Sequence, residues 1–328
     1  MWSLQEHRLA LFAFLPLLVY FTWMDVALYY RVQSVHLVGA EHAPEAAGLF
    51  SPFTGLSVKL IMSDHVNSYV HVPLAGLFDQ MTHLSDVFYF ITPNMISFAG
   101  VLTSLAAAKV VTVDSLAMHH SAVFLMELRS WLDTMDGLVA RKRMGLYRHV
   151  SLQDTSGYLV DGIADTIGFS LFLFGCFLYL RHKMPTTKHY LPVVSDPANE
   201  KVSATLVVTT YSARRIMTLL LCFGLQMGVS CVFWNRYIQA YHTLLETDAS
   251  PAKEVAQSQV LQSSMMWIIM WFWRLCNAHA FMHMFLFAVF IGRMWEFLVW
   301  IQYIGYVVLF ILIAFTEVHL SSASDYLA

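Results

Sequence analysis

The stretch LDTMDGLVARKRMGLYRHVSLQDTSGYLVDGIAD, residues 132–165, decides the fold because it sets acidic side chains between two apolar runs. The run before it reads HHSAVFLMELRSW, and the run after it reads TIGFSLFLFGCFLYL. Four carboxylates of the stretch, Asp133, Asp136, Asp161 and Asp165, lie next to these apolar runs. Charged side chains are costly within a membrane and usually have a function there. These acids are therefore the first candidates for a functional site.

Side chains four residues apart lie on one face of a helix, and the stretch contains two sets with this spacing. The first set is Asp133, Gly137 and Arg141, flanked by Asp136 and Ala140, and the second is Gly157, Asp161 and Asp165. If the two helices are antiparallel neighbours, four carboxylates face one another and need hard divalent cations between them. The small residues leave room for a flat ligand, and Arg141 can donate two parallel hydrogen bonds to a phosphate.

The pattern D-x2-D-G-x2-A-R, a spacer, then G-x3-D-x3-D resembles the signature of the CDP-alcohol phosphotransferase family. ITPNMISFAG at 91–100 is similar to the start of that family's first core helix. The resemblance implies a bound CDP-alcohol, two divalent metal ions, and attack of an acceptor hydroxyl on the β-phosphate with release of CMP. It implies metal ligands at Asp133, Asp136, Asp161 and Asp165, a general base at Asp165, a diphosphate ligand at Arg141, and a nucleotide pocket at Gly137, Ala140, Arg141 and Gly157.

Two features depart from the commonest eukaryotic members of the family. The spacer at 142–156 is longer than usual, and Tyr158 and Gly162 stand where choline and ethanolamine phosphotransferases carry Glu and His. With the extra first span and the insertion described below, the chain is most similar to the invertebrate ceramide phosphoethanolamine synthases. That resemblance implies CDP-ethanolamine as donor, ceramide as acceptor, and manganese or magnesium as the metal. It also implies the Golgi with a luminal active site, with the endoplasmic reticulum as the alternative.

Two other functions stay open. One is a phosphotransferase whose acceptor is diacylglycerol or inositol. The other is a non-catalytic transporter lined with carboxylates, although transport does not require Gly, Ala and Arg at these positions. Because the site is predicted at the membrane edge with apolar walls, we expect the acceptor to be a membrane lipid. A homodimer is also left open.

The composition excludes a soluble globular protein. The chain has 328 residues, of which 58% are hydrophobic and 12% charged, as is typical of polytopic membrane proteins. The formal net charge of −3 is uninformative about nucleic acid, but the chain has no basic stripe, so no nucleic-acid partner is expected. The four cysteines lie in apolar runs, so no disulfide framework is expected.

Apolar runs long enough to cross a bilayer recur along the chain. We predict seven, at about 9–29, 93–113, 117–141, 157–181, 213–243, 263–290 and 295–316. The last six match the six-helix core that the family resemblance implies. The predicted fold is therefore an all-α polytopic membrane protein, with a six-helix CDP-alcohol phosphotransferase core and one extra N-terminal transmembrane helix.

The spans divide the chain into four predicted parts. They are an uncleaved N-terminal anchor at 1–30, an extramembrane luminal insertion at 31–92, a catalytic transmembrane domain at 93–316, and a C-terminal tail at 317–328. Within the insertion, 56–70 and 74–90 have helical periodicity. The second stretch could lie in the membrane interface or pack inside a small luminal domain. A polar loop is expected at 182–212.

Other polar residues of the spans allow two readings each. Arg129 lies four residues before Asp133 and could pair with it, or form a buried structural ion pair elsewhere. His279 and His283 are also four residues apart, but they lack the Glu of an HExxH zinc motif. For the two histidines, hydrogen-bonded packing and a role in binding the acceptor both stay open.

Overall fold

The computed structural model describes residues 4–34, 53, 56–146, 156–183, 187–192, 204–209, 212–247 and 250–327. Its elements in chain order are α1 (Leu4–Ser34), α2 (Val58–Met62), η1 (Asn67–His71), α3 (Val72–Thr82), α4 (Leu84–Val87), α5 (Pro93–Val111), α6 (Leu116–Arg143), α7 (Ser156–Lys183), β1 (Thr187–Pro192), β2 (Ala204–Thr209), α8 (Ala213–Leu245), α9 (Pro251–Leu261), α10 (Ser264–Cys276), α11 (Ala278–Phe290) and α12 (Met294–Leu327). The predicted class, an all-α polytopic membrane protein, is confirmed.

Four of the described helices are long and apolar enough to cross a membrane, namely α5, the Gly157–Lys183 part of α7, α8 and α12. Two shorter apolar helices, α10 and α11, occupy the segment 263–290 that we predicted as one span. Asn277 divides them, because its side chain accepts a hydrogen bond from the Ala280 backbone and caps α11. The predicted count of seven spans therefore stays a prediction.

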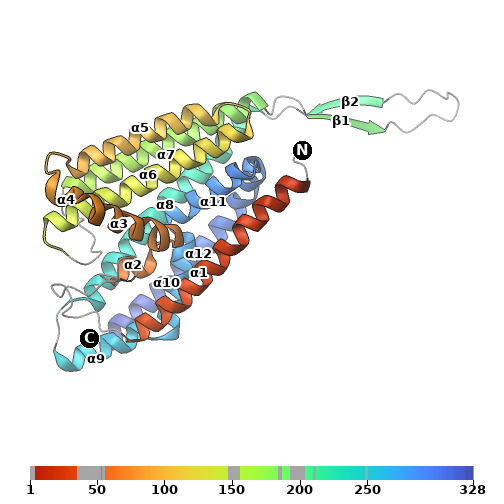
Figure 1. Cartoon of the computed structure of the whole chain (residues 1–328). Helices are drawn as coiled ribbons and strands as arrows, with labels where there is room; N and C mark the ends of the chain where they lie inside the picture. The colour runs from red at the N-terminus through yellow and green to blue at the C-terminus, as the bar shows by residue number, and fades with distance from the viewer. Residues whose placement is uncertain are drawn as a thin grey trace.

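Helices α5, α6 and α7 lie side by side along one edge of the molecule (Figure 1). Thr92 accepts a hydrogen bond from the Met95 backbone and Pro93 occupies the first turn, so the TPN sequence begins α5. Helix α7 approaches α5 closely at Gly175, where an added Cβ would lie 2.4 Å from the Ala108 carbonyl oxygen. Only glycine permits this contact, which fixes α7 against α5.

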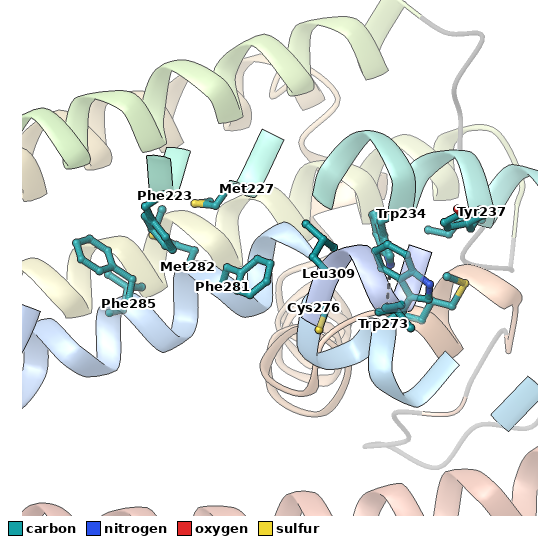
Figure 2. Close-up of a cluster of buried hydrophobic side chains, with 14 of the residues drawn as sticks. Phe223, Met227, Trp234, Tyr237, Trp273, Cys276, Phe281, Met282, Phe285 and Leu309 are labelled. Atoms are coloured by element: carbon teal, nitrogen blue, oxygen red, sulfur yellow. Dashed lines mark hydrogen bonds between the residues drawn. The ribbon is translucent and has the colours of Figure 1, made fainter. Parts of the chain in front are cut away.

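Aromatic and sulfur-containing side chains of α8, α10, α11 and α12 form the main hydrophobic core (Figure 2). Trp273 and Phe285 are fully buried there, and Trp273 donates a hydrogen bond from Nε1 to Thr316 on α12. Burial of a large apolar side chain contributes roughly 1.5–3 kcal/mol. This core holds α8, α10, α11 and α12 together as a second group of helices, which contacts α6 through α11.

The segment predicted as an insertion packs against both groups of helices. Helix α2 contacts α8 and α10, and its residues Val58, Leu60, Ile61 and Met62 are buried. Helices α3 and α4 contact α6. Whether this segment is luminal stays a prediction, but its first helix lies within the helical body.

Two regions differ from the expected loops and tail. The polar segment 182–212 contains an antiparallel hairpin, in which Thr187 pairs with Thr209 and Pro192 with Ala204, and it projects from the helical body (Figure 1). At the other end of the chain, α12 continues to Leu327, so the predicted tail at 317–328 is mostly its last part. Much of the predicted 142–156 loop, residues 147–155, lies outside the described residues.

Candidate active site

Helices α6 and α7 bring the four predicted carboxylates together. One oxygen from each of Asp133, Asp136 and Asp161 lies within 4.8 Å of the other two. A second group with the same limit joins Asp133 and Asp165 to a ring nitrogen of His279 on α11. The two groups share Asp133, so the acids of α6 and α7 form one continuous cluster.

Neighbouring side chains orient two of these acids. Ser97 on α5 donates a hydrogen bond from Oγ to Asp136 Oδ2 at 2.5 Å, and Asp136 is only 4% exposed. Arg129 donates from Nη2 to Asp165 Oδ1 across the α6–α7 contact. The sequence left open whether Arg129 pairs with Asp133. The ion pair that Arg129 forms is with Asp165, the fourth carboxylate of the cluster, and not with Asp133.

A small cavity of about 80 Å³ opens beside the cluster. It is lined by Asp136, Gly137, Ala140 and Arg141 of α6, by Gly157, Tyr158 and Asp161 of α7, by Pro93, Asn94 and Ser97 of α5, and by Lys59 of α2. The cavity thus gathers every residue predicted to line the nucleotide pocket. Its volume is near that of a few water molecules, which suits a phosphate group rather than a whole nucleotide.

Gly137 has a specific steric reason to be glycine. A Cβ at this position would lie 3.1 Å from Nη1 of Arg141, one turn further along α6. Any larger side chain must therefore move the guanidinium that lines the cavity. The spacing of Gly137 and Arg141 in the sequence reflects this contact.

Lys59 is a site residue that the sequence interpretation missed. It comes from α2, far from the motif in sequence, yet it lines the cavity beside Arg141. Burial, with the nearby Arg141 guanidinium, lowers the pKa of Lys59 below its ordinary value. The only signal in the sequence was a single lysine within the apolar run LSVKLIM.

A second polar cluster lies one turn along α11 from His279. Nδ1 of His283 is 3.0 Å from Glu127 Oε1, and its Nε2 is 3.5 Å from Asp64 Oδ1. The other Glu127 oxygen is 3.3 Å from Nε2 of His71. The sequence interpretation named His283, but Asp64 and His71 come from the insertion and were not expected here.

The structure is that of a membrane protein with a carboxylate cluster between two helices, and comparisons with known proteins identify its class as a phosphotransferase. The sequence model of the family described as ceramide phosphoethanolamine synthase matches residues 3–328. A ceramide phosphoethanolamine synthase of Drosophila melanogaster is 36% identical over 278 residues, which cover 84% of this chain and 71% of that protein. The chain belongs to the ceramide phosphoethanolamine synthase family. No solved structure matches it.

Proposed function

We propose that the protein transfers phosphoethanolamine from CDP-ethanolamine to the primary hydroxyl of ceramide and releases CMP. The observation that carries the proposal is a cluster of four carboxylates beside a cavity that is lined by two of them, by Arg141 and by three small residues, in a chain of this family. A transporter needs no arginine and no glycine beside its acids. Diacylglycerol or inositol as the acceptor would use the same donor site, so the acceptor must be tested directly.

The residues around the cavity suit the diphosphate of a nucleotide donor. Arg141 and Lys59 place two positive charges at one wall, and guanidinium groups bind phosphate through paired hydrogen bonds. Gly137, Ala140 and Gly157 leave the backbone accessible to a flat ligand. We assign nucleotide binding to these small residues and diphosphate binding to the two cations.

The chemistry of the acids fits hard divalent cations. Carboxylate oxygens are the ligands that Mg²⁺ and Mn²⁺ prefer, and Asp133, Asp136 and Asp161 approach one another within 4.8 Å. These three residues, with Asp165, would hold two ions. When bound, such ions neutralise phosphate charge and polarise the phosphoryl group.

Asp165 is the proposed general base. An alcohol is a weak nucleophile until a base accepts its proton, and Asp165 lies beside Asp133 with one oxygen held by Arg129. The guanidinium fixes the direction of the carboxylate, so we assign the second oxygen to the acceptor hydroxyl. The acceptor oxygen then bonds to the β-phosphorus, the bond to CMP breaks, and no covalent enzyme intermediate is required.

The proposed cellular setting is the Golgi membrane with the site facing the lumen, and the endoplasmic reticulum is the alternative. It is supported by the family and by a small excess of basic residues that the predicted spans put on the face opposite the site. Basic residues favour the cytosolic side of a membrane, so the site is expected on the other side. Immunogold labelling of an epitope placed next to the hairpin would test the orientation.

One assay tests the reaction. Purified protein is supplied with CDP-ethanolamine or CDP-choline, each with ceramide or diacylglycerol, and CMP release is measured. We expect turnover with CDP-ethanolamine and ceramide, loss of activity in EDTA, and recovery with Mn²⁺ or Mg²⁺ but not with Ca²⁺, which prefers looser coordination. Turnover of diacylglycerol but not ceramide would contradict the proposed acceptor, and no CMP release with any pair would contradict the enzyme.

A further inference from the structure

A second and much larger cavity, about 770 Å³ in volume, lies between α1, α11 and α12. Most of its lining is apolar, including Phe14, Leu17 and Leu18 of α1 and Phe287 of α11. We call it the α1–α11 cavity. Its size and apolar walls suit hydrocarbon chains, because pockets of this kind bury most of a lipid-like ligand.

One end of the α1–α11 cavity is polar and chemically specific. Glu127, His283 and Asp64 line it. The Glu127 side chain is 33% exposed, although both its oxygens are in contact with the histidines His71 and His283. A carboxylate has about four lone-pair sites, so Glu127 can accept further hydrogen bonds from a ligand in the cavity.

This polar end is next to the carboxylate cluster. On α11, His283 is one helical turn from His279, whose ring nitrogen is within 4.8 Å of oxygens of Asp133 and Asp165. On α6, Glu127 precedes Asp133 by six residues, or roughly 9 Å along the helix axis. A lipid head group at Glu127 would therefore lie less than two helical turns along α6 from Asp133 of the carboxylate cluster.

We propose that the α1–α11 cavity holds the hydrocarbon chains of the acceptor lipid, and that Glu127 accepts a hydrogen bond from the acceptor's amide N–H. Glu127 is then the residue that selects a ceramide over a diacylglycerol. Ceramide carries an amide N–H and a second hydroxyl near its primary hydroxyl, whereas diacylglycerol carries ester oxygens that cannot donate. The inference rests on the proposed function and adds to it the residue that recognises the acceptor.

The physical reason for selection is the charge of Glu127. A hydrogen-bond acceptor in a binding site is left without a partner when the ligand offers only other hydrogen-bond acceptors, and that ligand then binds more weakly. Ester oxygens facing Glu127 would also repel its charge. A hydrogen bond to a charged group changes affinity by roughly ten- to hundredfold, so this is the expected preference for ceramide.

The test compares three acceptors with equal chain lengths: ceramide, ceramide methylated on the amide nitrogen, and diacylglycerol. For the wild-type protein we expect a KM for ceramide that is roughly ten- to hundredfold below that for the methylated lipid. Glu127→Gln should lose most of this preference while the KM for CDP-ethanolamine stays unchanged. If Glu127 had only a structural role, its replacement would change the KM for CDP-ethanolamine as well as that for ceramide, or it would change the unfolding temperature.

Glu296→Gln is the matched control. Glu296 lines the same cavity but forms an ion pair with Arg293 at the start of α12. This position follows the C-terminal end of α11, whereas His279 of the carboxylate cluster lies at the N-terminal end of that helix. This variant should keep the wild-type preference. A photoactivatable ceramide, added without donor, should label α1, α11 or α12, and Phe287→Trp should reduce the labelling by narrowing the cavity.

The outcomes separate this proposal from the proposed function. If the wild-type protein turns over ceramide and its methylated form equally, or if Glu127→Gln keeps the preference, the selection by Glu127 is overturned while the enzyme activity stands. Labelling confined to other helices overturns the cavity assignment alone. Absence of CMP release with every acceptor overturns the proposed function and the inference with it.

Discussion

Asp25 on α1 and the acids of the carboxylate cluster on α6 and α7 differ in how their charges are balanced. Asp25 on α1 is surrounded by donors: its oxygens lie 2.8 Å from His65 Nε2, 2.7 Å from the Tyr69 hydroxyl and 2.7 Å from Trp271 Nε1. Arg274, which is fully buried, approaches it at 3.5 Å. Each of these contacts favours the ionised carboxylate, so Asp25 needs no external ligand.

The acids on α6 and α7 have the opposite arrangement. Asp133, Asp136 and Asp161 have oxygens within 4.8 Å of one another, and like charges at this separation repel. Asp25 therefore joins α1 to the rest of the protein, whereas the proposed cations would relieve the repulsion within the cluster. The comparison teaches that burial alone does not identify a functional acid; the balance of neighbouring charges does.

The largest expected effect comes from removing charge from the cluster. Asp133→Asn, Asp136→Asn or Asp161→Asn should each abolish CMP release, because each removes a ligand of the proposed cations. Without added metal, these variants should unfold at the same temperature as the wild-type protein or at a higher one, since the repulsion between the carboxylates is reduced. Manganese binding measured by electron paramagnetic resonance checks the cause. A variant with normal turnover would remove that residue from the metal site.

The base should have the next largest effect. Asp165→Asn should reduce turnover by roughly 10²–10⁴ and still bind CDP-ethanolamine, because proton transfer is lost and the donor site is kept. Arg141→Ala should weaken donor binding as well as turnover. Isothermal titration with metal at saturation measures both affinities. Loss of donor binding in the first variant and normal binding in the second would reverse the two assignments.

Asp25 should affect stability. Asp25→Asn leaves the buried Arg274 without its charged partner and should destabilise the protein by about 3–5 kcal/mol. Thermal unfolding in detergent micelles measures the change. Asp114→Asn is the control, because Asp114 forms an exposed pair with Lys183 that should contribute less than about 1 kcal/mol. Equal destabilisation by the two variants would contradict the distinction between buried and exposed pairs.

The smallest effect is expected for Lys59. Lys59→Met keeps the apolar stem and removes the charge, so donor affinity should fall by roughly ten- to hundredfold with little change in stability. Because the pKa of Lys59 is lowered, its charge is lost on raising the pH before that of an ordinary lysine. Donor affinity of the wild-type protein should therefore weaken at alkaline pH, and that of the variant should weaken less. An identical pH profile would exclude Lys59 from donor binding.

The sequence predicted the membrane class, the helices α6 and α7, and the residues that gather at their contact. It could do so because the motif is local: a step of four residues places Asp133, Gly137 and Arg141 on one helical face wherever the helix lies. The apolar flanks likewise determine their own burial. The division at Asn277 was missed because hydropathy does not register a side chain that caps a helix.

Only the tertiary structure decided the partners of these residues. Lys59 and His71 lie in the short elements α2 and η1, and Asp64 lies between these two elements, at positions that helical periodicity does not mark as functional. Packing of this segment against the body brings them to the two sites. The pairing of Arg129 with Asp165 likewise depends on how close α6 and α7 lie to each other. Helix α5 packs against both of them, and its contact with α7 is the close approach of Ala108 to Gly175. The sequence by itself determined which acids would gather between α6 and α7, because their spacing along each helix is a local property of the chain. Which charges meet them was decided by contacts between segments far apart in the chain.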